Sequence, residues 1–81
     1  MLWEIARLGL GDPRRLGTCD GGSTPAEGLA CWRDHEHAQG REVFPGNYGA
    51  REPGREAWYP FLLETADGKF RSIRDSADPR P

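Results

Sequence analysis

Long apolar runs, lysine, cysteine and aliphatic side chains are all scarce in this chain of 81 residues. No stretch approaches the roughly 20 consecutive apolar residues of a membrane-spanning helix. The apolar start is interrupted by Glu4 and Arg7, and it has neither the basic leader nor the small-residue cleavage site of a signal peptide. These absences exclude a membrane protein and predict one small soluble domain over residues 1–75, with a disordered tail at 76–81.

The core has few aliphatic residues from which to be built. Leu, Ile, Val and Phe make up only about 16% of the chain, a level at which disorder becomes a concern. Disordered chains usually also have a high net charge, whereas the net charge here is only −2. Three Trp, two Tyr and three Phe supply buried area in place of the missing aliphatic residues. The composition therefore predicts a compact core made largely of aromatic rings.

The basic residues are almost all arginine, with Lys69 the single lysine among eleven. Together with abundant Gly and Pro, this ratio is typical of a high-GC bacterial or phage genome. The slightly acidic total argues against a general nucleic-acid binder, which usually carries a basic excess. Two cysteines are too few for a disulfide scaffold, so we expect reduced thiols in the cytoplasm, and a Cys19–Cys31 disulfide only in an exported protein.

The clearest local signal is a helix start. Thr24-Pro25-Ala26-Glu27 has the pattern of a capping box, in which Thr24 accepts the Glu27 amide hydrogen and the Glu27 carboxylate reaches back to the Thr24 amide. The helix is predicted over about 25–39 and ends near Gly40. Gly28 in its first turn would let the helix lie close to a sheet.

The flanking segments predict strands and loops. Residues 2–10 fit a strand because four of five residues on one parity are apolar, whereas 11–24 is rich in turn residues and is predicted as a long loop. Residues 42–44 form a short strand candidate, followed by a turn at 47–49 and a polar loop at 50–56. The strongest strand signal is a C-terminal hairpin, 57–64 with 69–75, around Asp67-Gly68.

These elements predict an α+β domain of two layers, with one capped helix packed on a small antiparallel sheet. The alternative is a small, partly open β-barrel with one helix. An unpaired sheet edge would also allow a homodimer in place of a monomer.

One set of residues has the chemistry of a metal site. Zinc takes thiolate and imidazole ligands, and Cys31 and His35 lie one helical turn apart, with Cys19 and His37 as further candidates. The spacing lacks the short Cys-x2–4-Cys knuckle, and His37 lies about 200° around the helix from His35. The same cysteines could serve as a nucleophile beside His35, but so short a chain has little room for a substrate pocket.

A second set predicts a partner surface. Trp58, Tyr59 and Phe61 crowd one strand, and either a core this small takes up every ring or a sheet with one covered face leaves some of them exposed. Exposed rings and arginines are typical interface anchors. The predicted contact residues are Tyr48, Trp58, Tyr59, Phe61, Arg71 and Arg74. The sequence thus predicts a small non-enzymatic interaction protein, a regulator, inhibitor or accessory subunit without a cofactor, that presents this surface to a protein partner.

Two alternatives remain. The first is a zinc-stabilised module using the Cys and His set. The second is a nucleic-acid-binding domain that uses Lys69, Arg71 and Arg74 with Phe70 between them, because basic residues interleaved with an aromatic can hold single strands. The loop 21–24 before the helix could bind a phosphate, although Glu27 would repel it.

Overall fold

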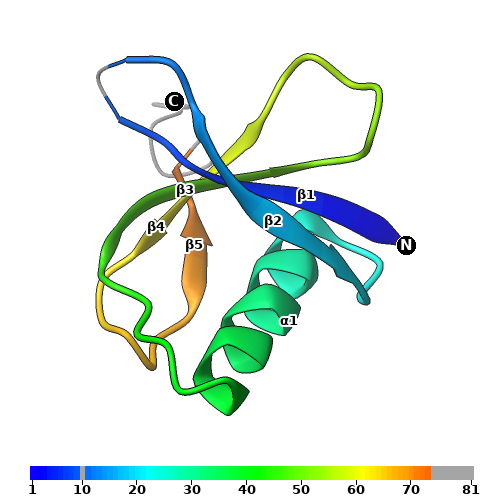
Figure 1. Cartoon of the computed structure of the whole chain (residues 1–81). Coiled ribbons are helices and arrows are strands. Elements are labelled where there is room, and N and C mark those ends of the chain that lie inside the picture. The colour runs from blue at the N-terminus through cyan, green and yellow to red at the C-terminus, as the bar shows by residue number, and fades with distance from the viewer. Residues whose placement is uncertain (10, 74–81) are drawn as a thin grey trace, which may run out of the picture.

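The computed structural model describes residues 1–9 and 11–73. Along the chain it has β1 (Leu2–Arg7), β2 (Arg14–Asp20), α1 (Pro25–Ala38), β3 (Gly46–Arg51), β4 (Tyr59–Leu63) and β5 (Phe70–Ser72). The strands form one antiparallel sheet in the order β2-β1-β3-β4-β5, and α1 lies against one face of it (Figure 1). The two-layer α+β prediction is confirmed, and the sheet is open, with β2 and β5 as its edges.

The helix begins as its sequence predicts. The Thr24 hydroxyl accepts a hydrogen bond from the Glu27 amide at 3.2 Å, and Gly40, with φ +78°, follows the C-cap. The Glu27 carboxylate, however, accepts from the amide and hydroxyl of Ser23 at 2.7 and 3.1 Å, one residue earlier than predicted. These two bonds lower the pKa of Glu27. The close approach expected at Gly28 is confirmed, because a Cβ there would overlap the Trp3 side chain.

The predicted N-terminal strand is confirmed, but its buried face is the other parity. Trp3 and Ile5 lie in the core, whereas on the opposite parity Leu2 is 44% exposed and only the small Ala6 is fully buried. The large Trp3 side chain lies in the core because it packs on the helix at Gly28. Its indole N–H also donates to the Gly22 carbonyl at 3.3 Å. The alternation in the sequence therefore identified the strand without identifying its core face.

Two segments predicted as loops or turns are strands. β2 lies within the predicted loop 11–24, and β3 covers the predicted turn and the start of the polar loop, whereas residues 42–44 lie outside the sheet. All but one of the β2 residues are exposed, so its sequence has no apolar alternation. In β3, Gly49 makes room for the Leu8 side chain, which would be only 3.0 Å from a Cβ at that position.

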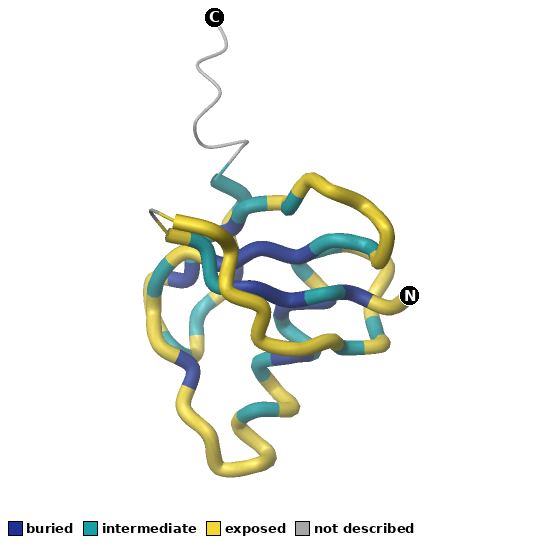
Figure 2. The backbone as a smooth tube through the Cα atoms, turned by 45° about the horizontal axis from the view of Figure 1, so that its top comes forward, coloured by how far each residue is buried: buried dark blue, intermediate teal, exposed yellow. Residues whose placement is uncertain are grey.

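The core lies between the sheet and α1 and is built on aromatic rings, as predicted. Tyr48 lies near its centre, with its ring 5.7 Å from that of Trp32 and 5.8 Å from that of Phe70. Figure 2 shows the buried segments in the central strands, while β2 runs exposed along the edge. The buried cluster comprises Trp3, Ile5, Leu29, Trp32, Val43, Tyr48, Ala50, Phe61, Leu63 and Phe70.

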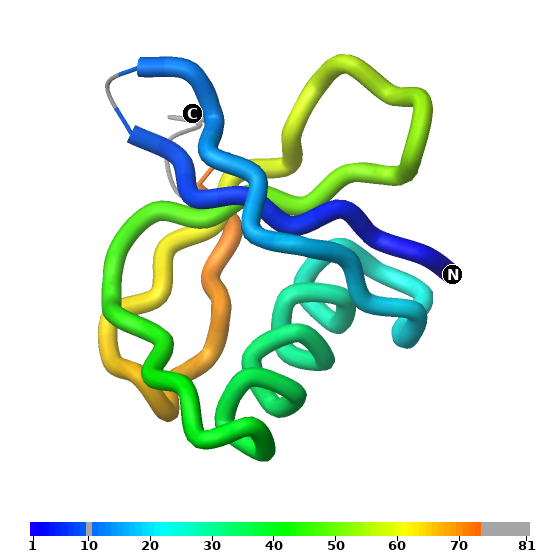
Figure 3. Tube along the Cα trace, in the orientation of Figure 1, coloured from blue at the N-terminus to red at the C-terminus, as the bar shows by residue number. Residues whose placement is uncertain are grey.

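The connections between strands differ in where they project. Figure 3 shows the β3–β4 connection extending away from α1, whereas the segment from the helix end to β3 leads from the helix toward the β4–β5 end of the sheet. No helix in the described part of the chain is long and apolar enough to cross a membrane. Arg74 and the predicted tail 76–81 lie outside the described residues.

Candidate functional site

A hollow of about 420 Å³ lies between the edge strand β2, the C-terminal half of α1 and the segment that leads from the helix to β3. We call it the β2–α1 groove. Its size is that of a small-ligand or side-chain pocket. It is lined by Arg7, Arg14, Leu16, Trp32, Glu36, Glu42, Val43, Phe44 and Tyr48.

The β2 side of the groove lies at an irregularity of the sheet. Next to the groove residue Leu16, Gly17 lies opposite Ile5, and a Cβ at Gly17 would have no neighbour within 4 Å. The register between β1 and β2 shifts just there, in a bulge that includes Leu16. The bulge places Leu16 on the rim of the groove.

Apolar side chains form the rim and the floor of the β2–α1 groove. Leu16 is 39% exposed and Phe44 is 61% exposed, so both are available for contact. Trp32, Val43 and Tyr48 lie beneath them and are buried. An exposed aromatic ring beside a firmly packed floor is the arrangement in which interface anchors are found.

Arg7 is fixed in the wall of the groove. Its Nη1 donates to the Tyr48 hydroxyl at 2.7 Å and to the Phe44 carbonyl at 3.2 Å, and its Nη2 donates to the Pro45 carbonyl at 2.9 Å. Its guanidinium carbon also lies 4.8 Å from the centre of the Tyr48 ring. All these acceptors are neutral, so they hold the guanidinium in place without balancing its charge.

A second arginine stands directly across from the first. Arg14 is the β2 residue paired with Arg7 in the ladder, and its side chain is exposed. Among residues 1–9 and 11–73, neither arginine forms an ion pair. The groove therefore carries two arginines, paired in the ladder, that form no ion pair with another described residue.

The acidic residues of the groove differ in how far their charge is balanced. Glu36 accepts three hydrogen bonds of 3.0–3.1 Å from the Arg41 guanidinium, which lower the pKa of Glu36. Glu42 has no ion pair within the described part of the chain and lies on the side of the groove near Phe44. The Glu36 charge is thus offset locally, whereas that of Glu42 is not.

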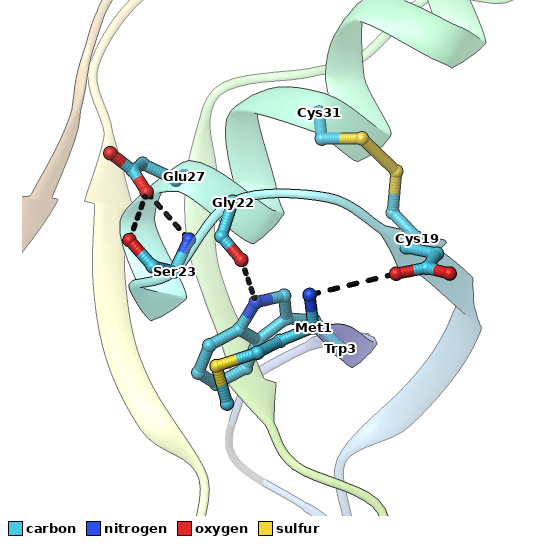
Figure 4. Close-up of polar contacts among 8 residues, drawn as sticks. Met1, Trp3, Cys19, Gly22, Ser23, Glu27 and Cys31 are labelled. Atoms are coloured by element: carbon cyan, nitrogen blue, oxygen red, sulfur yellow. Dashed lines mark hydrogen bonds and ion pairs between the residues drawn. A yellow bond between two sulfur atoms is a disulfide. The ribbon is translucent and has the colours of Figure 1, made fainter.

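The cysteines proposed as zinc ligands are joined to each other. Cys19 at the end of β2 and Cys31 in α1 form a disulfide, with their Cα atoms 6.3 Å apart (Figure 4). The prediction of reduced thiols is therefore wrong for this structure. In the disulfide, neither cysteine can supply a thiolate ligand for zinc or act as a nucleophile. His35 and His37 are exposed, and no group of three metal-binding side chains occurs among the described residues.

The aromatic residues predicted to contact a partner do not form one surface. Tyr48 and Phe61 are buried in the core, and Arg74 lies outside the described residues. Tyr59 is 43% exposed, and Trp58 is half-buried. Only the last two rings are placed to touch a partner, and they line a separate hollow of about 380 Å³ with residues 54–57.

The arginines near these rings are engaged. The Arg51 guanidinium lies 4.1 Å from the Trp58 ring centre, and its Nε donates to the Glu4 carboxylate at 2.7 Å. Arg71 pairs with Glu64 at 3.1 Å. These contacts balance the charges of Arg51 and Arg71, whereas Arg7 and Arg14 in the β2–α1 groove form no ion pair with another described residue.

The residues considered for nucleic acid lack a stacking surface. Phe70, which separates Lys69 from Arg71, is buried, and Arg33 lies over its ring at 5.3 Å. The loop before α1 is also engaged, because the Glu27 carboxylate already occupies the Ser23 amide. Neither segment therefore presents free groups in the manner that the sequence suggested.

Sequence reasoning missed the groove because its residues come from five separate parts of the chain, namely β1, β2, α1, the segment after the helix, and β3. Leu16 and Arg14 lie in a segment predicted as loop, and Phe44 in one predicted as strand. No protein-family model, curated protein or solved structure matches this chain.

Proposed function

We propose that this chain is a non-enzymatic interaction module that binds a protein partner through the β2–α1 groove. The observation that carries the proposal is the exposed pair Leu16 and Phe44 above a buried floor. Desolvated aromatic and aliphatic anchors supply most of the binding energy at protein interfaces. The disulfide between β2 and α1 supports it further, because it fixes two walls of the groove relative to each other before binding.

The test replaces exposed apolar side chains by serine on each of the two candidate surfaces and compares partner binding. Leu16→Ser with Phe44→Ser removes the groove anchors, and Tyr59→Ser removes the exposed ring of the surface predicted from sequence. Tagged wild-type protein and both variants are used for affinity purification from the native host, after circular dichroism has shown equal folding.

We expect the wild type and Tyr59→Ser to retain the same partner and the double variant to lose it. Loss with Tyr59→Ser alone would move the interface to the β3–β4 side. Retention by both variants would contradict a role for either surface.

The disulfide also bears on location. Disulfides persist in oxidising compartments and are rare in the cytoplasm. We therefore favour an oxidising compartment over the cytoplasm expected from the sequence. Alkylation of protein taken directly from the host, followed by mass measurement, distinguishes them: unlabelled cysteines support the disulfide in the cell, and two labelled cysteines place the protein in a reducing compartment.

A further inference from the structure

We infer that the segment recognised by the β2–α1 groove is an acidic peptide of the partner protein, with a carboxylate side chain next to an apolar one. This inference rests on the proposed function and names the chemistry of its ligand. The carboxylate would lie between Arg7 and Arg14, and the apolar side chain would pack between Leu16 and Phe44.

The first argument is the cross-strand pair itself. Arg7 and Arg14 are direct partners in the ladder of β1 and β2, and both line the groove. Like charges directly opposite each other in a sheet destabilise it. An anion placed between two guanidinium groups reverses the sign of that interaction, so binding an acidic ligand relieves a repulsion that the free protein retains.

The second argument is that Arg7 is already in position. Its three hydrogen bonds to Tyr48, Phe44 and Pro45 leave Nε–H and one Nη2 hydrogen without an acceptor in the described part of the chain. Gly46 contributes, because a Cβ there would overlap the guanidinium. A guanidinium held in advance loses little side-chain freedom on binding, and a carboxylate matches two of its donors.

The third argument concerns the apolar rim. A simple inorganic anion would use the arginines alone and leave Leu16 and Phe44 in water. A peptide that places an apolar side chain beside an acid covers both features at once. Glu42, on the Phe44 side of the groove, repels an acidic ligand. Neutralising Glu42 should therefore strengthen binding, which is a test that does not depend on a loss of affinity.

The experiment selects a displayed library of random dodecapeptides against the oxidised wild-type protein. The best peptide is then titrated by fluorescence, and its site is mapped by NMR shifts of the Leu16 methyl and Trp32 indole signals. The variants are Arg14→Gln, Glu42→Gln and, as the matched control, Arg15→Gln. Arg15 is the next residue of β2, pairs with Ala6 in the ladder and contacts Glu4 at 3.5 Å, so it does not line the groove.

We expect a consensus with Asp or Glu next to an aromatic or aliphatic residue. Arg14→Gln should weaken binding roughly fivefold, the usual effect of a partly exposed ion pair. Glu42→Gln should tighten binding, and Arg15→Gln should leave it unchanged. Equal losses of peptide affinity with Arg14→Gln and Arg15→Gln would show that binding depends only on the overall charge of the protein, and would overturn the inference.

The outcomes separate the inference from the proposed function. A basic or purely apolar consensus that maps to the groove overturns the acidic ligand and leaves the proposed function standing. Peptides that map elsewhere, or no enriched peptide, contradict both. Phenylacetate provides the small-molecule comparison: if it binds as tightly as the best peptide, the ligand is a free acid and the peptide assignment is overturned.

Discussion

The disulfide should supply a large share of the stability of this domain. The perturbation is the double variant Cys19→Ala with Cys31→Ala, compared with the oxidised and the reduced wild type. Six of the seven β2 residues are exposed, and Cys19 is the exception. The edge strand therefore depends on its pairing with β1 and on the bond to α1, since its other side chains bury little surface.

The magnitude follows from the length of the closed loop. The two cysteines are 12 positions apart, and cross-linking a loop of that size removes about 3 kcal/mol of chain entropy from the unfolded state. A small domain has a total stability near the low end of about 5–15 kcal/mol. The loss would lower the melting temperature by roughly 12–24 °C for a domain of this size.

The assay is thermal and urea denaturation of the three forms, followed by circular dichroism and tryptophan fluorescence. Reduced wild type and the double variant should agree with each other and should both lie about 3 kcal/mol below the oxidised protein. A difference below about 1 kcal/mol would refute the reasoning. It would mean that ladder pairing alone holds β2, and hydrogen exchange of the β2 amides would then show equal protection in all forms.

Three further results are expected. Gly28→Ala should destabilise the domain by about 1–3 kcal/mol in urea denaturation, because the new Cβ would overlap Trp3. The control Gly54→Ala has open space around its Cβ and should act only through its positive φ. Equal losses of stability in the two variants would contradict the close approach of Gly28 to Trp3. Hydrogen bonds from Arg51 and Ser23 lower the pKa values of Glu4 and Glu27. The contribution of these two ionised carboxylates to the stability of the fold is therefore present above about pH 4.5, the ordinary pKa, and is lost as the pH falls through the lowered values. The melting temperature should therefore fall below pH 4.5, and less so in Glu27→Gln; an unchanged slope in that variant would contradict the assignment. Native mass spectrometry should find no zinc on the oxidised protein, because both thiols are in the disulfide, and zinc uptake only after reduction would revive the metal-bound alternative.

The parts of the fold that the sequence predicted are those with local causes. The start of α1 depends on Thr24, Pro25 and Glu27, all within one turn, and the C-terminal hairpin depends on a short connection between two strands. In both cases the residues that determine the structure are neighbours in sequence. Local chemistry was therefore sufficient to place them.

The parts that the sequence missed depend on distant neighbours. β3 is a strand because Gly49 accommodates Leu8 and because Tyr48 packs on Trp32, contacts that no local pattern shows. The groove is more distant still, since Arg7 and Phe44 meet only after β1 and β3 have paired. The disulfide was considered from sequence, but the bond depends on a strand, β2, that the pattern had placed in a loop.

The order of strands in the sheet has a consequence for how the chain folds. β1 pairs with β2 across a short connection, but its other neighbour is β3, where Ile5 lies opposite Ala50 from the far half of the chain. Long-range pairing of this kind is slow, because a large loop must close before its contacts form. We expect α1 and the β4–β5 hairpin to gain structure first, and the joining of β1 to β3 to set the folding rate, so that the groove is the last part of the molecule to be completed.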